Sequence, residues 1–195
     1  MIKNLQNKLK FIELIDKMKD IDRAIYLKNW KQENDAEHSY HLAMMTIVFS
    51  EDFPELNLEK CIKFALIHDL VEIYAWDTIA VIDLEWLKTK EKREKDAINR
   101  LEKEFWNILW NILDLIKEYE SKASKEARFV YSLDKIHPII QNVIVKWKGW
   151  RKWNYNLEKT KENQYSKVYS EFWLEKVLDI YFEKAEKENM FYNEK

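Results

Sequence analysis

Three ionisable side chains interrupt one of the most apolar stretches of the chain. His68, Asp69 and Glu72 lie within residues 61–73, whose other members are almost all apolar, a pattern typical of a helix buried inside a domain. Burying ionisable groups costs free energy unless each has a charge partner, a hydrogen bond or a metal ion. On a helix, Glu72 lies four residues after His68 and three after Asp69, so the three side chains can converge on one surface. The segment is therefore predicted to hold a functional site.

Further candidate ligands lie on two other predicted helices. His38 lies near the start of an apolar helix that follows the capping residues Asn34 and Asp35. Asp134 lies beside the apolar stripe of a later helix. Together with the His-Asp pair, these residues give two imidazoles and two carboxylates, a mixed nitrogen and oxygen set that suits a hydrolytic divalent ion such as Mn, Co, Fe, Ni or Zn. The pattern indicates a metal site with positions left for water and substrate.

The order of a helical histidine, a His-Asp pair and a distant aspartate resembles that of the HD-domain metal phosphohydrolases. Within them, the chain is most similar to the branch of small 5'-deoxynucleotidase-like proteins. The resembling stretches span most of the chain, and together they are far more specific than any one alone. They are residues 33–39, 68–78, 88–94 and 126–135.

The resemblance implies a metal centre and names its ligands. It carries the ligand role to His38, His68, Asp69 and Asp134, and it implies a divalent ion drawn from Mn, Co, Fe, Ni, Zn or Mg. It also implies an all-α fold, with residues 1–195 forming a single HD-type helical bundle around the metal site. A homodimer is expected on the same ground.

The resemblance further implies three residues that act on the substrate. Glu72 and Asp77 would be catalytic acids, and Arg23 would contact the phosphate. Glu72 could relay a proton between the attacking water and the leaving 5'-oxygen, and the planar fork of Arg23 could hold phosphate oxygens. Asp77 could order either the attacking water or a sugar hydroxyl, and these two roles stay open.

Each candidate also has a purely structural interpretation. His68 and Asp69 could satisfy one another, His38 could cap local backbone, and Asp134 could pair with a neighbouring basic residue. Arg23 could be a surface charge. The combination of all these residues in the resembling pattern favours the metal site over these separate explanations.

Other polar residues near the candidate ligands are expected to support the metal site rather than to bind the ion. His41 and His137 each lie three residues after a predicted ligand, and we interpret them as packing or supporting residues. Glu33 and Glu37 either support the ligands or cap the helix.

Helical periodicity organises the rest of the chain, and no segment is typical of a sheet. Pro138 is expected to bend or break the helix that carries Asp134. The helices are predicted near residues 4–21, 35–49, 57–75, 97–119, 124–144 and 164–187.

Composition excludes several classes of protein. Lys and Arg number 33 against 35 Asp and Glu, so the net charge of -2 favours neither nucleic acid nor an anionic membrane as a partner. A single cysteine, Cys61, excludes an internal disulfide framework and is typical of a reducing compartment. Residues 1–20 lack the continuous apolar core of a signal peptide, and no apolar run approaches a membrane span. A soluble, cytoplasmic protein is expected.

The chain therefore predicts a metal-dependent phosphomonoesterase that hydrolyses (deoxy)nucleoside 5'-monophosphates, with a small-molecule nucleotide as its substrate. Two alternatives stay open. One is an HD phosphohydrolase for another phosphoester, such as a nucleoside triphosphate or a cyclic dinucleotide. The other is a non-catalytic HD module that binds a nucleotide and signals to a partner, although the presence of all four candidate ligands and Glu72 argues against it.

Glycine is almost absent from the chain. It has one glycine and nine tryptophans among 195 residues, whereas average usage would give about 14 glycines. In the resembling family, glycine normally precedes the Asp-Thr pair, where this chain has Trp76. Trp30 and Trp86 also stand at apparent glycine positions in polar loops, whereas Trp150 and Trp173 look like true tryptophans. One hypothesis is that the gene uses UGA as a glycine codon and that the printed sequence reads it as tryptophan; the alternative is a protein rich in tryptophan.

Intact mass of the natively expressed protein distinguishes these two explanations. The recoding hypothesis predicts a mass below that of the printed sequence, because each replacement of tryptophan by glycine removes an indole side chain. A native mass that agrees with all nine tryptophans would end the hypothesis.

Overall fold

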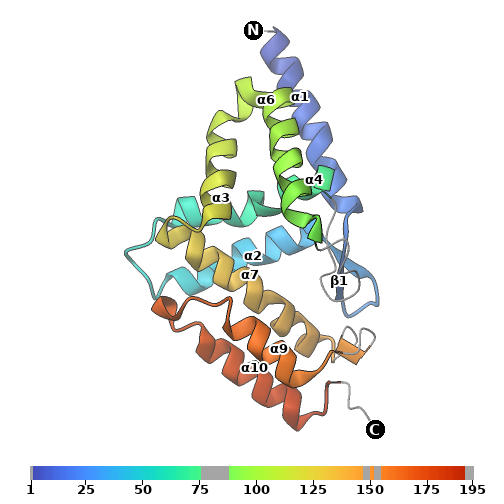
Figure 1. The fold of residues 1–195 in the computed structure, drawn as a ribbon, viewed down its shortest axis with the longest axis vertical. Coiled ribbons are helices and arrows are strands. Elements are labelled where there is room, and N and C mark those ends of the chain that lie inside the picture. Colours follow the sequence, from blue (N-terminus) through green and yellow to red (C-terminus); the bar gives the residue numbers. More distant parts are fainter. Residues whose placement is uncertain (1, 76–87, 147–149, 152–154, 192–195) are drawn as a thin grey trace.

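The computed structural model confirms the predicted all-α class (Figure 1). It describes residues 2–75, 88–146, 150–151 and 155–191. Within these ranges, helices make up nearly all of the regular structure, accompanied by one small sheet of two strands. Among the described residues, none of the helices combines the length and the apolar character needed to cross a membrane.

The N-terminal helical segment packs on the core mainly through its C-terminal end. Helix α1 (Ile2–Ile15) runs into a 3-10 helix, η1 (Asp16–Asp20), where the periodicity predicted one helix. It lies along α6 in Figure 1, and Leu14 and Met18 are buried. Leu5, Leu9 and Ile12 are exposed, whereas Met18, at the other end of the same apolar stripe, packs on the core as expected.

A short antiparallel hairpin follows, although no sheet was expected. Strand β1 (Asp22–Tyr26) pairs with β2 (Gln32–Asn34), and the backbone N–H of Leu27 donates to the carbonyl of Lys31 at 2.8 Å across the turn. The segment lacks the alternation of apolar and polar residues that identifies a strand. Its pairing is decided by packing against the helices, which sequence periodicity cannot show.

Three predicted helix starts are confirmed by their caps. Helix α2 (Asp35–Ser50) begins with a capping box in which Asn34 accepts from the N–H of Glu37 and Glu37 accepts from the N–H of Asn34. Asn57 caps α3 (Leu58–Ile67), and Ser124 caps α7 (Lys125–Ile144). Glu37 is therefore a capping residue.

The central helix is not continuous, in contrast to the prediction. After α3, the chain forms a 3-10 helix, η2 (His68–Val71), and then a single turn, α4 (Glu72–Ala75). The tighter 3-10 turn falls on the His-Asp pair itself, and such breaks within helices often mark functional sites. His68, Asp69 and Glu72 still line one pocket, as predicted.

The remaining helices surround this centre. Helix α6 (Lys90–Ser121) begins earlier than the helix predicted near residues 97–119. Pro138 lies inside α7 without ending it. Of the last helix, predicted near residues 164–187, only α10 (Glu175–Lys187) forms as an α-helix, preceded by the 3-10 helix η3 (Ser170–Phe172). Helix α9 (Leu157–Tyr165) lies almost entirely before the predicted start and was not expected.

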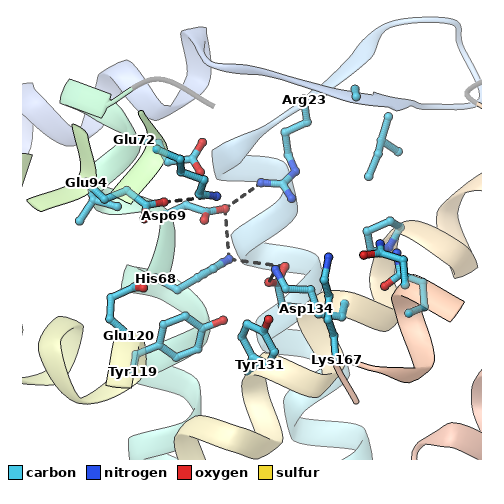
Figure 2. Close-up of a pocket in the computed structure, with 18 of the residues that line it drawn as sticks. Arg23, His68, Asp69, Glu72, Glu94, Tyr119, Glu120, Tyr131, Asp134 and Lys167 are labelled. Carbon is cyan, nitrogen blue, oxygen red and sulfur yellow. Dashed lines mark hydrogen bonds and ion pairs between the residues drawn. The ribbon is translucent and has the colours of Figure 1, made fainter. Parts of the chain in front are cut away.

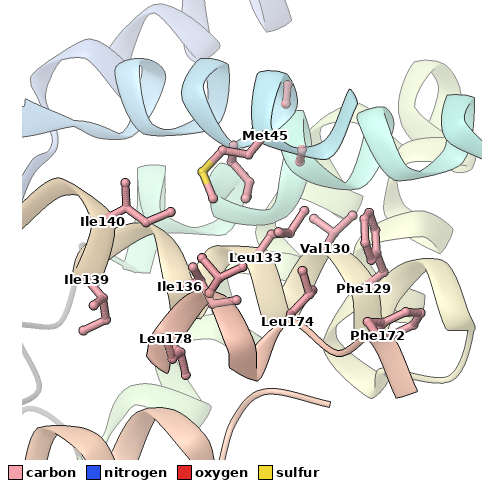
Figure 3. Close-up of a cluster of buried hydrophobic side chains, with 14 of the residues drawn as sticks. Met45, Phe129, Val130, Leu133, Ile136, Ile139, Ile140, Phe172, Leu174 and Leu178 are labelled. Atoms are coloured by element: carbon pink, nitrogen blue, oxygen red, sulfur yellow. The ribbon is translucent and has the colours of Figure 1, made fainter. Parts of the chain in front are cut away.

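Two hydrophobic clusters meet at the site. The larger cluster lies between α2, α3, α7 and α10, and Figure 3 shows the α7 side chains at its centre. The smaller cluster joins α1, η2, α4 and α6. Ala65 belongs to the first and Ile67 to the second, so the chain passes from one cluster to the other directly before His68. Fully buried members from α7 include Phe129, Val130, Leu133 and Ile136.

The described tryptophans differ in their surroundings. Trp150 is 2% exposed and stacks on Phe191, as suits a true tryptophan. Trp30 has a φ of 70°, a left-handed conformation that favours glycine. Trp173 was interpreted as a true tryptophan, yet it too is left-handed, with a φ of 44°. Trp76 and Trp86 lie outside the described residues.

Replacing Trp30 by glycine is expected to raise the free energy of unfolding by about 1 kcal/mol, because glycine adopts the left-handed conformation without a clash at Cβ. Urea denaturation would measure the change. Trp106→Gly serves as the matched control, because Trp106 is equally exposed but lies inside α6, where glycine lowers stability by roughly 0.5 kcal/mol. A loss of stability in Trp30→Gly would contradict the left-handed conformation as the deciding factor.

Candidate active site

The structure brings the four predicted ligands together from three elements. His38 comes from α2, His68 and Asp69 from η2, and Asp134 from α7. The Nε2 atom of His38 lies 3.2 Å from Nε2 of His68 and 3.1 Å from Oδ1 of Asp134. Nε2 of His68 lies 3.1 Å from Oδ2 of Asp69. All four residues are at least nine-tenths buried.

These distances fit donors that share one metal ion. Ligands at about 2.0–2.2 Å from an ion stand roughly 3.0–3.5 Å from one another. Two further pairs are slightly wider, with Nε2 of His38 at 3.9 Å from Oδ2 of Asp69 and Nε2 of His68 at 3.8 Å from Oδ1 of Asp134. Two imidazoles and two carboxylates form a donor set that suits a divalent ion. The residues present therefore fit a metal centre.

Two basic side chains balance the buried carboxylates. Nη1 of Arg23 lies 2.8 Å from Oδ2 of Asp69, and Nζ of Lys135 lies 2.6 Å from Oδ2 of Asp134. Burial acts to raise the pKa of Asp69, but the neighbouring charges of His68 and Arg23 outweigh it and hold the pKa below its usual range. Lys135 likewise outweighs burial and lowers the pKa of Asp134. Both side chains are therefore carboxylates at neutral pH.

The two histidines differ in their electrostatics. Burial lowers the pKa of His38 to about 4, so its imidazole is neutral and can offer a lone pair to a metal. Burial also acts to lower the pKa of His68, but the charge of Asp69 raises it above the ordinary value. Because a metal binds neutral imidazole, an ion at His68 would compete with the proton that Asp69 favours there.

Arg23 is held by acids from three elements. In addition to Asp69, its guanidinium contacts Oδ1 of Asp35 at 3.2 Å and Oε2 of Glu33 at 3.7 Å. Arg23 lies on β1, so the unexpected hairpin is the element that brings this side chain to the ligands. Figure 2 shows the guanidinium of Arg23 directed toward Asp69.

Three of the four predicted ligands, His68, Asp69 and Asp134, line a polar pocket of about 490 Å³ (Figure 2), while His38 is fully buried beside them. Glu72, at the start of α4, is buried and lines this pocket together with Arg23. Both residues therefore lie where residues that act on the substrate are expected to lie. Asp77 lies outside the described residues. The other residues that line the pocket and are labelled in Figure 2 are Glu94, Tyr119, Glu120, Tyr131 and Lys167.

Several pocket residues were missed by the sequence analysis. Lys135 was considered only as a structural partner of Asp134, although it lies inside a resembling stretch. Lys90 also lies inside such a stretch and contacts Glu94 at 3.2 Å. Tyr131 lies in the same resembling stretch as Lys135. Lys167 carries no sequence signal, because its place in the pocket depends on how the C-terminal segment packs against α7.

His41 and His137, interpreted as packing or supporting residues, lie behind His38 on the side away from the pocket residues. Nδ1 of His137 is 3.2 Å from Nδ1 of His38, and Nε2 of His137 is 3.0 Å from Nδ1 of His41. Glu33 lies beside them, with Oε1 at 3.4 Å from Nε2 of His137. Burial raises the pKa of Glu33 to about 7, although Arg23 acts to lower it.

The sequence resembles known proteins over most of its length. The family model described as "HD domain" matches residues 15–174. The 5'-deoxynucleotidase HDDC2 of Bos taurus is 33% identical over 139 residues, which are 70% of this chain and 66% of that protein. The protein of the same name from Danio rerio is 35% identical over 147 residues, 70% of this chain and 68% of that protein. The match thus spans about two thirds of each relative.

Solved structures share the arrangement of helices. A "Predicted metal-dependent phosphohydrolase" from Magnetospirillum magnetotacticum MS-1 superposes with a TM-score of 0.82 at 26% identity, covering 97% of this chain and 99% of that chain. A conserved hypothetical protein from Pyrococcus furiosus has a TM-score of 0.65 at 26% identity, covering 92% of this chain and 99% of that chain.

Adding Mn²⁺ is expected to stabilise the protein, because an ion that binds only the folded state adds about 2.7 kcal/mol when its free concentration is 100 times Kd. Thermal unfolding with and without the ion would measure this as a rise in Tm. His38→Ala and Asp134→Ala should lose the rise, whereas Asp96→Ala, an exposed aspartate on α6, should keep it. If Mn²⁺ raised the Tm of Asp134→Ala as much as that of the wild type, the ion would bind at another site.

Proposed function

This chain belongs to the HD-domain family, and on that premise we propose that it is a metal-dependent phosphomonoesterase that hydrolyses (deoxy)nucleoside 5'-monophosphates to nucleoside and phosphate. One observation carries the proposal: two imidazoles and two carboxylates converge, and three of these four residues line one pocket together with Glu72 and Arg23. The names of the relatives from Bos taurus and Danio rerio support a 5'-deoxynucleotide as substrate.

His38, His68, Asp69 and Asp134 would hold one divalent ion, drawn from Mn, Co, Fe, Ni, Zn or Mg. When bound, such an ion supplies Lewis acidity at the phosphoryl group and lowers the pKa of a water molecule beside it. The protein contributes the geometry, because the ligands come from three separately anchored elements that are packed between two hydrophobic clusters. Rigid placement of this kind limits the reorganisation needed during the reaction.

Glu72 is proposed to transfer a proton from the attacking water to the leaving 5'-oxygen. Its side chain is buried beside the ligands and faces the same pocket. A carboxylate there can accept a proton from the attacking water and return it to the 5'-oxygen as the phosphorus–oxygen bond breaks. Because Glu72 begins α4 directly after η2, its position is tied to that of His68 and Asp69.

Arg23 is proposed to contact the phosphate. Its guanidinium is oriented by Asp35 and Asp69 and lines the pocket, so little side-chain entropy is lost when a substrate arrives. A planar cation beside the phosphoryl group offsets the negative charge that develops in the transition state. Asp77 keeps its proposed role from the family resemblance alone.

The size and polarity of the pocket suit one small nucleotide. Its volume of about 490 Å³ lies within the range of roughly 300–1,000 Å³ usual for small-molecule sites. Lys135 and Lys167 add positive charge near the ligands, while Tyr131 offers an aromatic face on the same side. We propose the homodimer as well, and the exposed Leu5, Leu9 and Ile12 on α1 are compatible with it.

Phosphate release from a panel of deoxy- and ribonucleoside 5'-monophosphates, with Mn²⁺ or Co²⁺ added, tests the proposal. The wild type should release inorganic phosphate. Asp69→Ala should release none, because it loses a ligand, and Glu72→Gln should lower kcat by about 10²–10⁴ fold while still binding the metal. Asp96→Ala, the exposed control, should match the wild type.

Other products would overturn the proposed substrate class. Release of triphosphate from a nucleoside triphosphate, or opening of a cyclic dinucleotide, without phosphate from any monophosphate would assign a different phosphoester. A wild type that binds metal and nucleotide but turns over none of these compounds would instead be a non-catalytic nucleotide-binding module.

A further inference from the structure

A line of hydrogen-bonding side chains runs from His38 away from the pocket. His137 is completely buried and its Nδ1 lies 3.2 Å from Nδ1 of His38. Its Nε2 lies 3.0 Å from Nδ1 of His41 and 3.4 Å from Oε1 of Glu33. The buried Glu33 stands just before α2, which carries both His38 and His41, while α7 carries His137.

Helix periodicity places these residues behind the ligands. His41 follows His38 by three residues on α2, and His137 follows Asp134 by three on α7. Residues three apart lie on the same helix face. Each helix therefore presents one proposed ligand and, one turn later, one imidazole that the proposed mechanism does not use.

The chemistry of imidazole fixes the proton positions along this line. A neutral imidazole carries one proton, so one ring nitrogen donates and the other accepts. If Nε2 of His38 binds the ion, its proton is on Nδ1, and this N–H donates to Nδ1 of His137. His137 must then carry its own proton on Nε2, which can donate to Nδ1 of His41 or to Oε1 of Glu33.

We propose that His137 is a positioning residue for the metal centre: it accepts the Nδ1 proton of His38 and so holds that ring in the tautomer and orientation that turn Nε2 toward the ion. This inference rests on the proposed metal at His38. Partners of this kind raise the basicity of a ligating histidine, and their loss typically weakens metal binding about 10–100 fold.

The same proton positions decide against a second ion. The donor atoms of Glu33, His41 and His137 lie within 4.8 Å of one another, an arrangement that could itself hold a metal. An ion on Nε2 of His137 would force the proton of that ring onto Nδ1, where it would face the N–H of His38. With both imidazoles neutral, the two sites exclude each other. The expected stoichiometry is therefore one ion per chain.

Zn²⁺ titration by calorimetry tests the role of His137. His137→Leu should weaken Zn²⁺ binding about 10–100 fold, and His137→Gln should recover much of the affinity because its side-chain oxygen accepts a hydrogen bond. His41→Leu is the matched control, since Glu33 remains as an acceptor for His137 and binding should change little. Urea denaturation of the metal-free variants separates this effect from a general loss of folding.

The tautomers of His38 and His137 can also be measured directly in the wild type. The chain has four histidines, so ¹⁵N spectra of the Zn²⁺-loaded protein can be assigned, and they should show His38 protonated on Nδ1 and His137 on Nε2. A His137 protonated on Nδ1, equal Zn²⁺ affinity in His137→Leu, or a second equivalent of Zn²⁺ that His41→Leu removes would each overturn the inference and leave the proposed function standing. A wild type that binds no metal would overturn both.

Discussion

The structure depends on keeping two carboxylates charged in a buried place. Asp69 and Asp134 sit at the junction of the two hydrophobic clusters, where an unpaired carboxylate would cost several kcal/mol. Arg23 and Lys135 supply the positive charge that makes this possible. A divalent ion would enter this same balance, so the basic residues and the proposed metal compensate one set of charges. Truncating either basic residue would therefore disturb folding as well as chemistry.

The local irregularities of the fold follow from this requirement. The 3-10 turn of η2 interrupts an otherwise helical run at His68, and the hairpin carries Arg23 across to Asp69. Both features also bury apolar side chains, Leu70 and Val71 from η2 and Ile25 from β1. Both features bring charged side chains to the same buried site. The chain therefore departs from regular helix at the residues that form the site.

Support for the site extends well beyond the proposed ligands. The ring of His38 has Asp134 and His68 on one side and His137 on the other, and Glu33 reaches both Arg23 and His137. Glu33, which lies beside Arg23, thus also lies beside the imidazole that contacts His38. Substitutions in either part are coupled for this reason, and their effects would not add independently.

The sequence alone determined the helical class and the capped starts of α2, α3 and α7, because periodicity and capping are local properties of the chain. It also predicted that His68, Asp69 and Glu72 meet, and they do line one pocket, although a 3-10 turn replaces the continuous helix on which that prediction rested. Tertiary structure decided what depends on partners distant in sequence. The pairing of the hairpin, the exposed face of α1, the places of Lys135, Tyr131 and Lys167 in the pocket, and the contact between His38 and His137 join residues from separate elements. No local pattern records such contacts, because packing sets them.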